Sequence, residues 1–260
     1  MAMTVSLSEQ SPLPLPAGGK AFELGGWTVH EFETVNSTNL VATGLPVWHA
    51  VRAETQTAGR GRFERAWVSD QGGLWLSAVV PASDPRVLAG VPLIAGLAVC
   101  NALKQLGVEQ LRMRWPNDVL VQDRKLAGSL VDQFAPDRRV IGIGVNVTNQ
   151  PEAFDPKLRN LTARLADLLS PTPPVREVAQ VILAQLRPLV IELSNQGFAA
   201  LGERINDLWG RSRQVELALD SVVLRGMFNG VDKLGRLLLH NAGSVAAYQP
   251  SQVRHLHELT

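Results

Sequence analysis

Three arginines lie close together in the segment ETQTAGRGRFERAW, residues 54–67. The guanidinium groups of Arg60, Arg62 and Arg65 repel one another, and each presents donors whose geometry fits phosphate or carboxylate oxygens. A segment this basic and this poor in apolar side chains does not bury enough surface to hold one shape. The sequence therefore predicts a mobile loop that closes over an anionic ligand. A solvent-exposed basic loop without a ligand is the alternative.

Two further groups that can do chemistry stand at the ends of predicted strands. In RWPND, residues 114–118, a strand closes at a proline turn where Asn117 and Asp118 offer a carboxamide and a carboxylate. Such a pair can order Mg²⁺, accept a hydrogen bond from an amine, or only cap the turn. Lys125 opens the apolar strand KLAGSLV, where a lysine either meets an anion or is exposed in a hairpin.

Glycines make one strand face unusually flat. In IGIGVN, residues 141–146, Gly142 and Gly144 alternate with β-branched residues and so fall on the same face of a strand. Gly128 in the preceding strand extends this face. Glycine inside a strand often marks the close approach of a ligand or of another backbone. A bound flat ring and a tight helix–sheet contact both explain the pattern. With the arginines, the lysine and the Asn–Asp pair, these segments describe a site for an acyl phosphate or acyl adenylate.

Other elements must position these groups. Along the chain, most of the predicted strands of the sheet come before most of the predicted helices. The sequence predicts an α+β fold with a mixed or antiparallel central sheet, helices packed on it, and a small β-barrel after residue 210. Predicted strands of the sheet cover residues 27–32, 47–54, 73–80, 111–115, 119–122, 125–134 and 140–147. Predicted helices cover residues 87–106, 161–169, 175–195 with a kink near Pro188, and 198–209. Predicted barrel strands cover residues 214–220, 222–229, 236–240, 244–248 and 252–256.

Size and composition fit an ordinary globular protein. The 260 residues, 45% of them hydrophobic, are enough for one large core and a small module, and the formal net charge of +1 does not favour a polyanionic partner. Cys100 is the only cysteine, which excludes a disulfide framework and fits the cytoplasm. Residues 1–26 are predicted to be an irregular leader without the pattern of a secretory signal. No apolar run approaches the ~20 residues of a membrane span.

The histidines show no metal-ligand spacing, and we expect His255 and His257 to be surface residues.

Taken in order, four segments resemble the successive signatures of biotin protein ligases: ETQTAGRGR, RWPNDV, RKLAGSLV and GIGVNV. NSTN at residues 36–39 is similar to the family's N-terminal biotin-site segment, and GVDKLGRLLL at residues 230–239 to its SH3-like tail. The resemblance extends from about residue 27 to residue 256. It implies a class II synthetase-like catalytic domain, residues 27–210, followed by an SH3-like C-terminal domain, residues 211–260.

The resemblance also implies an activity. Members of the family use ATP and Mg²⁺ to convert biotin into biotinyl-5′-AMP, with release of pyrophosphate. They then pass biotin to one lysine of the biotin carboxyl carrier domain of acetyl-CoA carboxylase or a related carboxylase. Some members carry an N-terminal DNA-binding domain, and the roughly 26 residues that precede the catalytic fold here are too few for one. We therefore expect a carrier-protein partner and no DNA or membrane partner, and a homodimer is possible.

Individual residues acquire roles from the same resemblance. The residues expected to bind biotin are Ser37, Thr38, Gln56, Gly59, Arg60, Lys125, Gly128 and Gly142. Those expected to bind ATP or the adenylate are Arg62, Arg65, Trp67, Arg114, Asn117 and Asn146, with Mg²⁺ held through the ATP phosphates. Lys125 and Arg62 would stabilise charge that develops during the reaction. Asp118 would receive the incoming lysine, which must lose its proton because its free pKa is ~10.4.

Two positions depart from the family pattern. Glu64 stands where glycine is usual, and its carboxylate could pair with Arg62 or Arg65 or alter loop closure, so we expect weaker or slower retention of the adenylate. Arg114 stands where lysine is usual in the family. The positive charge is kept, but it is spread over a planar guanidinium group instead of a compact ammonium group.

Three other functions compete with a biotin ligase. Lipoate or octanoate ligases and transferases share the architecture, whereas a non-catalytic sensor is expected to lack Lys125 or Asp118. A Rossmann dehydrogenase does not fit, because the arginine loop lacks a third glycine and a following helix.

Overall fold

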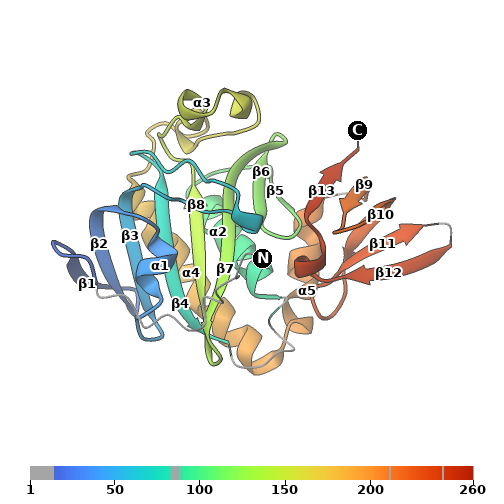
Figure 1. Ribbon diagram of the computed structural model, residues 1–260, viewed down its shortest axis with the longest axis horizontal. Helices are drawn as coiled ribbons and strands as arrows, with labels where there is room; N and C mark the ends of the chain where they lie inside the picture. The colour runs from blue at the N-terminus through green and yellow to red at the C-terminus, as the bar shows by residue number, and fades with distance from the viewer. Residues whose placement is uncertain (1–14, 83–87, 89, 211, 242, 260) are drawn as a thin grey trace, which may run out of the picture.

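The computed structural model describes residues 15–82, 88, 90–210, 212–241 and 243–259. Two β-sheets organise this part of the chain (Figure 1). The larger sheet has the strand order β1-β2-β3-β4-β8-β7-β6-β5, and only its β2–β3 pair is parallel. The second sheet has the order β12-β11-β10-β9-β13 with antiparallel pairs. The predicted α+β class, with a mixed sheet followed by a small β unit, is confirmed.

The elements have the following bounds. The larger sheet contains β1 (Lys20–Leu24), β2 (Trp27–Val35), β3 (His49–Gln56), β4 (Leu74–Pro81), β5 (Leu111–Arg114), β6 (Asp118–Val121), β7 (Arg124–Ala135) and β8 (Arg138–Val145). The second sheet contains β9 (Arg213–Ala218), β10 (Val223–Val231), β11 (Leu237–Asn241), β12 (Ser244–Tyr248) and β13 (His255–Glu258). The helices are α1 (Thr38–Ala42), α2 (Val91–Gln105), α3 (Pro151–Phe154), α4 (Val175–Gln196) and α5 (Ala199–Asn206). Short 3₁₀ helices cover Arg62–Glu64, Pro156–Leu158, Leu165–Asp167, Asp207–Trp209 and Pro250–Gln252.

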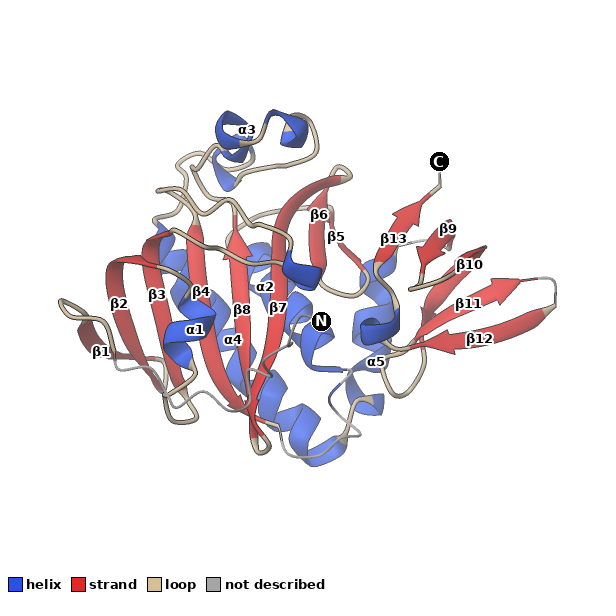
Figure 2. Cartoon of the chain, in the orientation of Figure 1, coloured by secondary structure: helices blue, strands red, loops and turns tan. Residues whose placement is uncertain are grey.

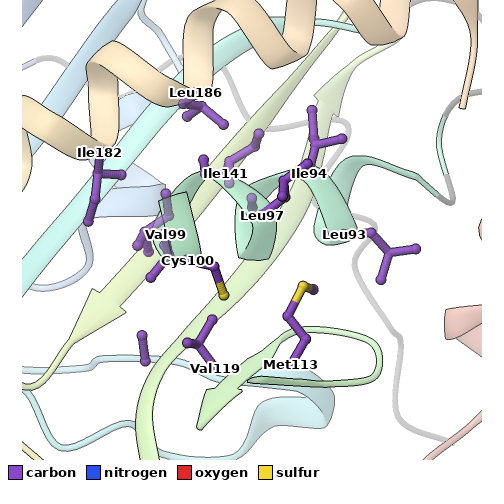
Figure 3. Packing of buried hydrophobic residues seen from close by; sticks show 14 of the residues in the cluster. Leu93, Ile94, Leu97, Val99, Cys100, Met113, Val119, Ile141, Ile182 and Leu186 are labelled. Atoms are coloured by element: carbon purple, nitrogen blue, oxygen red, sulfur yellow. The ribbon is translucent and has the colours of Figure 1, made fainter. Parts of the chain in front are cut away.

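Helices α2 and α4 cover one face of the larger sheet, and α1 lies on the other (Figure 2). Strand β8 shows how the sequence sorts these faces. Ile141 is fully buried among apolar side chains of α2 and α4 (Figure 3), whereas Gly142 and Gly144 point to the α1 side. Burial raises the pKa of the Cys100 thiol on α2 to about 12, so this residue packs as a small hydrophobe, as predicted.

Several predicted elements differ from the structure. Residues 20–24 were expected to be irregular but form β1, which pairs with β2 through a turn at Gly25 and Gly26, both at positive φ. Residues 161–169 are not a helix, because Leu161 and Ala163 form backbone hydrogen bonds with Lys125 and leave only a 3₁₀ turn at Leu165–Asp167.

Two boundaries also move. The helix predicted over residues 87–106 begins at Val91, and its residues 87 and 89 lie outside the described residues, as do residues 1–14 of the expected leader. The last strand begins at His255, because Pro250–Gln252 form a 3₁₀ turn. Helix α4 continues through Pro188, and the kink there stays a prediction. Within the described residues, no helix has the length and apolar character needed to span a membrane.

Candidate active site

A cavity of about 290 Å³ opens on the α1 side of the larger sheet. Every predicted site residue lines it except Gly59. A Cβ atom at Gly59 would lie 2.3 Å from the Ser69 hydroxyl and 2.4 Å from the Trp67 carbonyl oxygen. Gly59 is therefore packed inside the base of the arginine loop and is not among the lining residues, and its expected contact with biotin stays a prediction.

The side chains at one end of the cavity form a hydrogen-bond network without net charge. Gln56 Oε1 accepts from the backbone N–H and the hydroxyl of Thr38 at 2.8 and 3.0 Å, and Gln56 Nε2 donates to Ser69 Oγ at 2.9 Å. Ser77 Oγ lies 2.7 Å from Thr38 Oγ1 and 2.6 Å from Asn39 Oδ1. Thr38, Asn39 and Ser77 are buried. Since α1, β3 and β4 each hold part of the network, its donors and acceptors are fixed before a ligand arrives. Ser37, the N-cap residue of α1, lines the same end.

Arg60 joins this end through a carboxylate that the sequence did not reveal. Asp132 Oδ2 on β7 accepts from Arg60 Nη2 at 3.0 Å and from Asn39 Nδ2 at 2.9 Å. The ion pair neutralises Arg60, so the whole end suits a neutral polar group. Sequence reasoning missed Asn39, Ser77 and Asp132. The polar Ser77 inside the apolar run LWLSAVV was the one signal that could have found this network.

The opposite end of the cavity is charged. Lys125 Nζ lies 2.6 Å from Asp118 Oδ1, and Arg114 Nη2 lies 2.7 Å from Asp118 Oδ2. Burial alone would raise the pKa of Asp118, but Lys125 and Arg114 outweigh burial and hold that pKa below its ordinary value. The alternatives of an exposed hairpin lysine and a simple turn cap are therefore wrong. Lys125 Nζ also lies 4.6 Å from the centre of the Trp67 ring.

The flat glycine face supports two different neighbours. A Cβ atom at Gly144 would lie 2.8 Å from Trp67 Nε1, and one at Gly128 would lie 3.2 Å from the same indole, so Trp67 rests on this surface. Gly142 instead admits the Asn39 side chain of α1, as the helix–sheet alternative predicts. Trp67 Nε1 is buried without a hydrogen-bond partner among the described residues. The indole N–H thus faces the strand at Gly144, while the Trp67 side chain as a whole lines the cavity.

Two asparagines assigned to the nucleotide hold the scaffold. Asn146 Nδ2 donates to the carbonyl oxygens of Lys125 at 3.4 Å and Ala163 at 3.2 Å, and its Oδ1 accepts from Asn149 at 3.1 Å. Asn117 Nδ2 donates to the Ser129 carbonyl oxygen at 2.7 Å. Asn146 thus fixes the backbone of Lys125, and nucleotide contacts of both amides stay predictions.

The arginine loop is docked onto the second sheet. Arg62 Nη2 donates to the carbonyl oxygens of Pro250 at 2.5 Å and Val253 at 3.0 Å. The Phe63 ring lies between the guanidinium groups of Arg62 and Arg254, at 4.8 and 4.7 Å. Arg65 Nη2 donates to the Arg254 carbonyl oxygen at 3.4 Å. These contacts hold Arg62 and Phe63 against residues 250–254, although Glu64 and Arg65 are exposed, and the mobility of the loop stays a prediction.

Positive charge is concentrated where the loop meets the cavity. Burial lowers the pKa of Arg62 to about 10, with Asp118 opposing the shift and Arg65 adding to it. Neither Arg62 nor Arg65 forms an ion pair with Glu64 among the described residues, so the expected pairing of that carboxylate is wrong. The two guanidinium groups bond only to carbonyl oxygens and remain able to bind a stronger, anionic acceptor.

The second sheet also contributes to the cavity wall through Arg254, His255 and Leu256. His255 is exposed, as predicted, but it stands at the cavity rim and not on a remote surface. No local pattern could reveal this, because the wall forms only when a segment near the C-terminus docks against the arginine loop.

Comparison with known proteins agrees with this arrangement. The profile of the Biotin/lipoate A/B protein ligase family matches residues 31–146. The biotin–[acetyl-CoA-carboxylase] ligase of Mycobacterium tuberculosis is 35% identical over 212 residues, 78% of this chain and 77% of that protein. The bifunctional ligase/repressor of Escherichia coli is 30% identical over 243 residues, 89% of this chain and 75% of that protein. For the bifunctional ligase/repressor of Bacillus subtilis the match covers only 42% of that protein, at 34% identity.

A solved structure extends the likeness to the fold. The biotin protein ligase of Aquifex aeolicus, in complex with biotin and ATP, superposes with a TM-score of 0.78 at 24% identity and covers 89% of this chain and 99% of that one. The matched fold, the two relatives aligned over most of their length and the four ordered motifs around one cavity lead to one assignment. The chain belongs to the biotin protein ligase family.

Proposed function

We propose that this protein is an ATP-dependent biotin protein ligase that forms biotinyl-5′-AMP and transfers biotin to a lysine of a biotin carboxyl carrier domain. The observation that carries the proposal is the polarity of the cavity. A neutral network around Thr38 and Gln56 occupies one end, and the Lys125–Asp118–Arg114 cluster occupies the other. Biotin has the same polarity, with a neutral ureido ring at one end and a carboxylate at the other.

The neutral end favours biotin over the other acids of the wider family. A ureido group offers a carbonyl acceptor and two N–H donors, and it can exchange hydrogen bonds with Thr38 and Asn39, which line the cavity and are bonded to Ser77. The dithiolane of lipoate and the alkyl end of octanoate would leave these buried groups without partners. Sites built to hydrogen-bond a substrate reject analogues that lack the group by about 10⁴–10⁵-fold.

The charged end supports the first chemical step. When the biotin carboxylate attacks the α-phosphorus of ATP, two anions approach each other and pyrophosphate leaves, so the site needs cations. The Lys125 ammonium has three N–H donors and can bind the reacting oxygens while it stays paired with Asp118, and Arg62 and Arg65 can exchange their carbonyl partners for phosphate oxygens. Each of these three groups is held beside the cavity before ATP arrives.

Mg²⁺ fits this site as an ion that binds together with ATP. Among the described residues that line the cavity, Asp118 is the only carboxylate, and both its oxygens are paired with cations. The described part of the chain holds no cluster of three or more His, Cys, Asp or Glu that suits a metal. When bound, Mg²⁺ would neutralise phosphate charge through ATP oxygens. The protein side chains would then orient the substrates.

The second step moves the biotinyl group to a lysine. A mixed anhydride hydrolyses easily, and the Trp67 indole with the docked arginine loop would keep water from it. The name of the M. tuberculosis relative supports acetyl-CoA carboxylase as the source of the carrier domain. A cytoplasmic location and a homodimer stay predictions of the sequence.

Pyrophosphate release with ATP–Mg²⁺ and biotin, lipoate or octanoate in turn tests the substrate. We expect pyrophosphate release with biotin and not with lipoate or octanoate. Release with lipoate or octanoate in its place would move the protein to the sister enzymes of the family. Tight biotin binding without any release would make it a sensor.

Replacing Glu64 by glycine is expected to lengthen the half-life of the bound adenylate about fivefold. Glu64 has φ +57°, in the left-handed region that costs a non-glycine residue ~1–2 kcal/mol. Glycine removes that strain and stabilises the docked loop over the cavity. Loss of adenylate from the purified complex is followed by chromatography, with Glu64→Gln as the matched control that removes the charge but keeps the strain. An unchanged half-life in Glu64→Gly would show that the residue does not affect retention.

A further inference from the structure

Transfer of biotin to a lysine requires a proton acceptor. The free lysine ammonium has a pKa of ~10.4 and is not a nucleophile until it loses a proton. Two side chains in the cavity can accept one: among the described lining residues, Asp118 is the only carboxylate and His255 the only imidazole.

Asp118 is poorly suited to take the proton. Its two oxygens lie 2.6 Å from Lys125 Nζ and 2.7 Å from Arg114 Nη2. These two cations stabilise the charged carboxylate and lower its affinity for a proton. Asp118 therefore serves better to hold Lys125 and Arg114 in place than to deprotonate an amine.

His255 is a cavity-lining residue that is accessible from outside the protein. It opens β13 and is exposed at the rim of the cavity, so a side chain from another protein can reach its ring. Two sets of contacts fix its position. Arg62 binds the carbonyl oxygens of Pro250 and Val253 just before it, and Arg112 on β5 binds both oxygens of Glu258 at the end of β13.

Burial and the groups that face His255 together lower its pKa. These groups are Arg65 on the loop, Arg114 on β5, Asp118 on β6 and His257 on the same strand. Partial burial lowers the pKa of His255, Arg65, Arg114 and His257 lower it further, and Asp118 opposes them. At pH 7 the imidazole is therefore unprotonated and ready to accept a proton.

We propose that His255 is the proton acceptor for the carrier lysine, an inference that rests on the proposed ligase function. The lysine nitrogen attacks the carbonyl carbon of the biotinyl–phosphate anhydride and a C–N bond forms. The bond from that carbon to the phosphate oxygen breaks, and AMP leaves with the electron pair. The proton of the amine passes to an imidazole nitrogen of His255 and from there to solvent.

Single-turnover transfer from the purified biotinyl-5′-AMP complex tests this role, because it does not depend on adenylate formation. The acceptor is the biotin carboxyl carrier domain of an acetyl-CoA carboxylase. We expect His255→Gln to transfer biotin about 100-fold more slowly than the wild type at pH 7. The wild-type rate should level off above an inflection below pH 6.5, the ordinary pKa of histidine, and the variant should lack this inflection. His240→Gln, on β11 of the same sheet and outside the cavity lining, is the matched control and should behave as wild type.

Hydroxylamine separates a proton acceptor from a merely structural residue. It is already neutral at pH 7 and needs no base to attack the adenylate, so it should react equally fast with the wild-type and His255→Gln complexes. Equal slowing toward hydroxylamine and the carrier domain would overturn the proposal, as would wild-type transfer by the variant. If the wild-type protein forms no adenylate from biotin, the ligase function fails instead.

Discussion

Replacing Lys125 by glutamine is expected to slow pyrophosphate release with biotin about 10³-fold, the upper range for losing one electrostatic contact to a transition state. Lys125 belongs to the charged end of the cavity, where its Nζ lies 2.6 Å from Asp118 Oδ1. Its ammonium can stabilise negative charge first on the biotin carboxylate and then on the phosphate. Glutamine keeps most of the side-chain volume but supplies no charge. Stopped-flow detection of pyrophosphate measures the effect.

Two variants accompany this experiment. Lys104→Gln, in the last turn of α2 and exposed, loses the same charge far from the cavity and should keep the wild-type rate. Lys125→Arg keeps the charge with a planar geometry and should restore the rate only in part. A Lys125→Gln rate within tenfold of the wild type would remove Lys125 from the first chemical step.

Adding one methyl group at Gly142 is expected to weaken biotin binding about 100-fold. In Gly142→Ala the new Cβ atom would lie 2.3 Å from Asn39 Oδ1 and 3.1 Å from Asn39 Nδ2. Asn39 cannot give way, because its amide is held by Ser77 at 2.6 Å and Asp132 at 2.9 Å. The displaced side chain would break the network that binds the ureido group and leave buried polar atoms unpaired, at about 1–3 kcal/mol each. Isothermal titration calorimetry with biotin gives the affinity.

Gly202→Ala is the matched control for this substitution. A Cβ atom at Gly202 on α5 would meet only Phe198, at 3.9 Å, so this variant should bind biotin as the wild type does. Wild-type affinity in Gly142→Ala would show that the Asn39 network does not bind biotin.

The sheet and most of its order were predictable because each strand carries its own local signal. The apolar run LWLSAVV predicted a central strand, and β4 lies inside the sheet between β3 and β8. The alternation of Gly142 and Gly144 with isoleucine and valine predicted one flat and one buried face of β8, as observed. Strand β1 was missed because three of its five residues are exposed, so only its pairing with β2 defines it.

The site was predictable as a set of motifs but not as a network. Lys125 and Asp118 came from strand ends, and the structure joins them in one ion pair. Asp132 and Asn39 meet across 93 positions of the sequence, a contact that no local pattern encodes. The expected helix at residues 161–169 failed for a similar reason, because pairing with Lys125 keeps that segment extended.

The most direct test of the central claim is mass spectrometry of a biotin carboxyl carrier domain after incubation with this protein, ATP–Mg²⁺ and biotin. A ligase predicts that the carrier gains the mass of one biotinyl group, and that peptide mapping places this group on a single lysine. A carrier that keeps its original mass, although the protein binds biotin tightly, would contradict the ligase function.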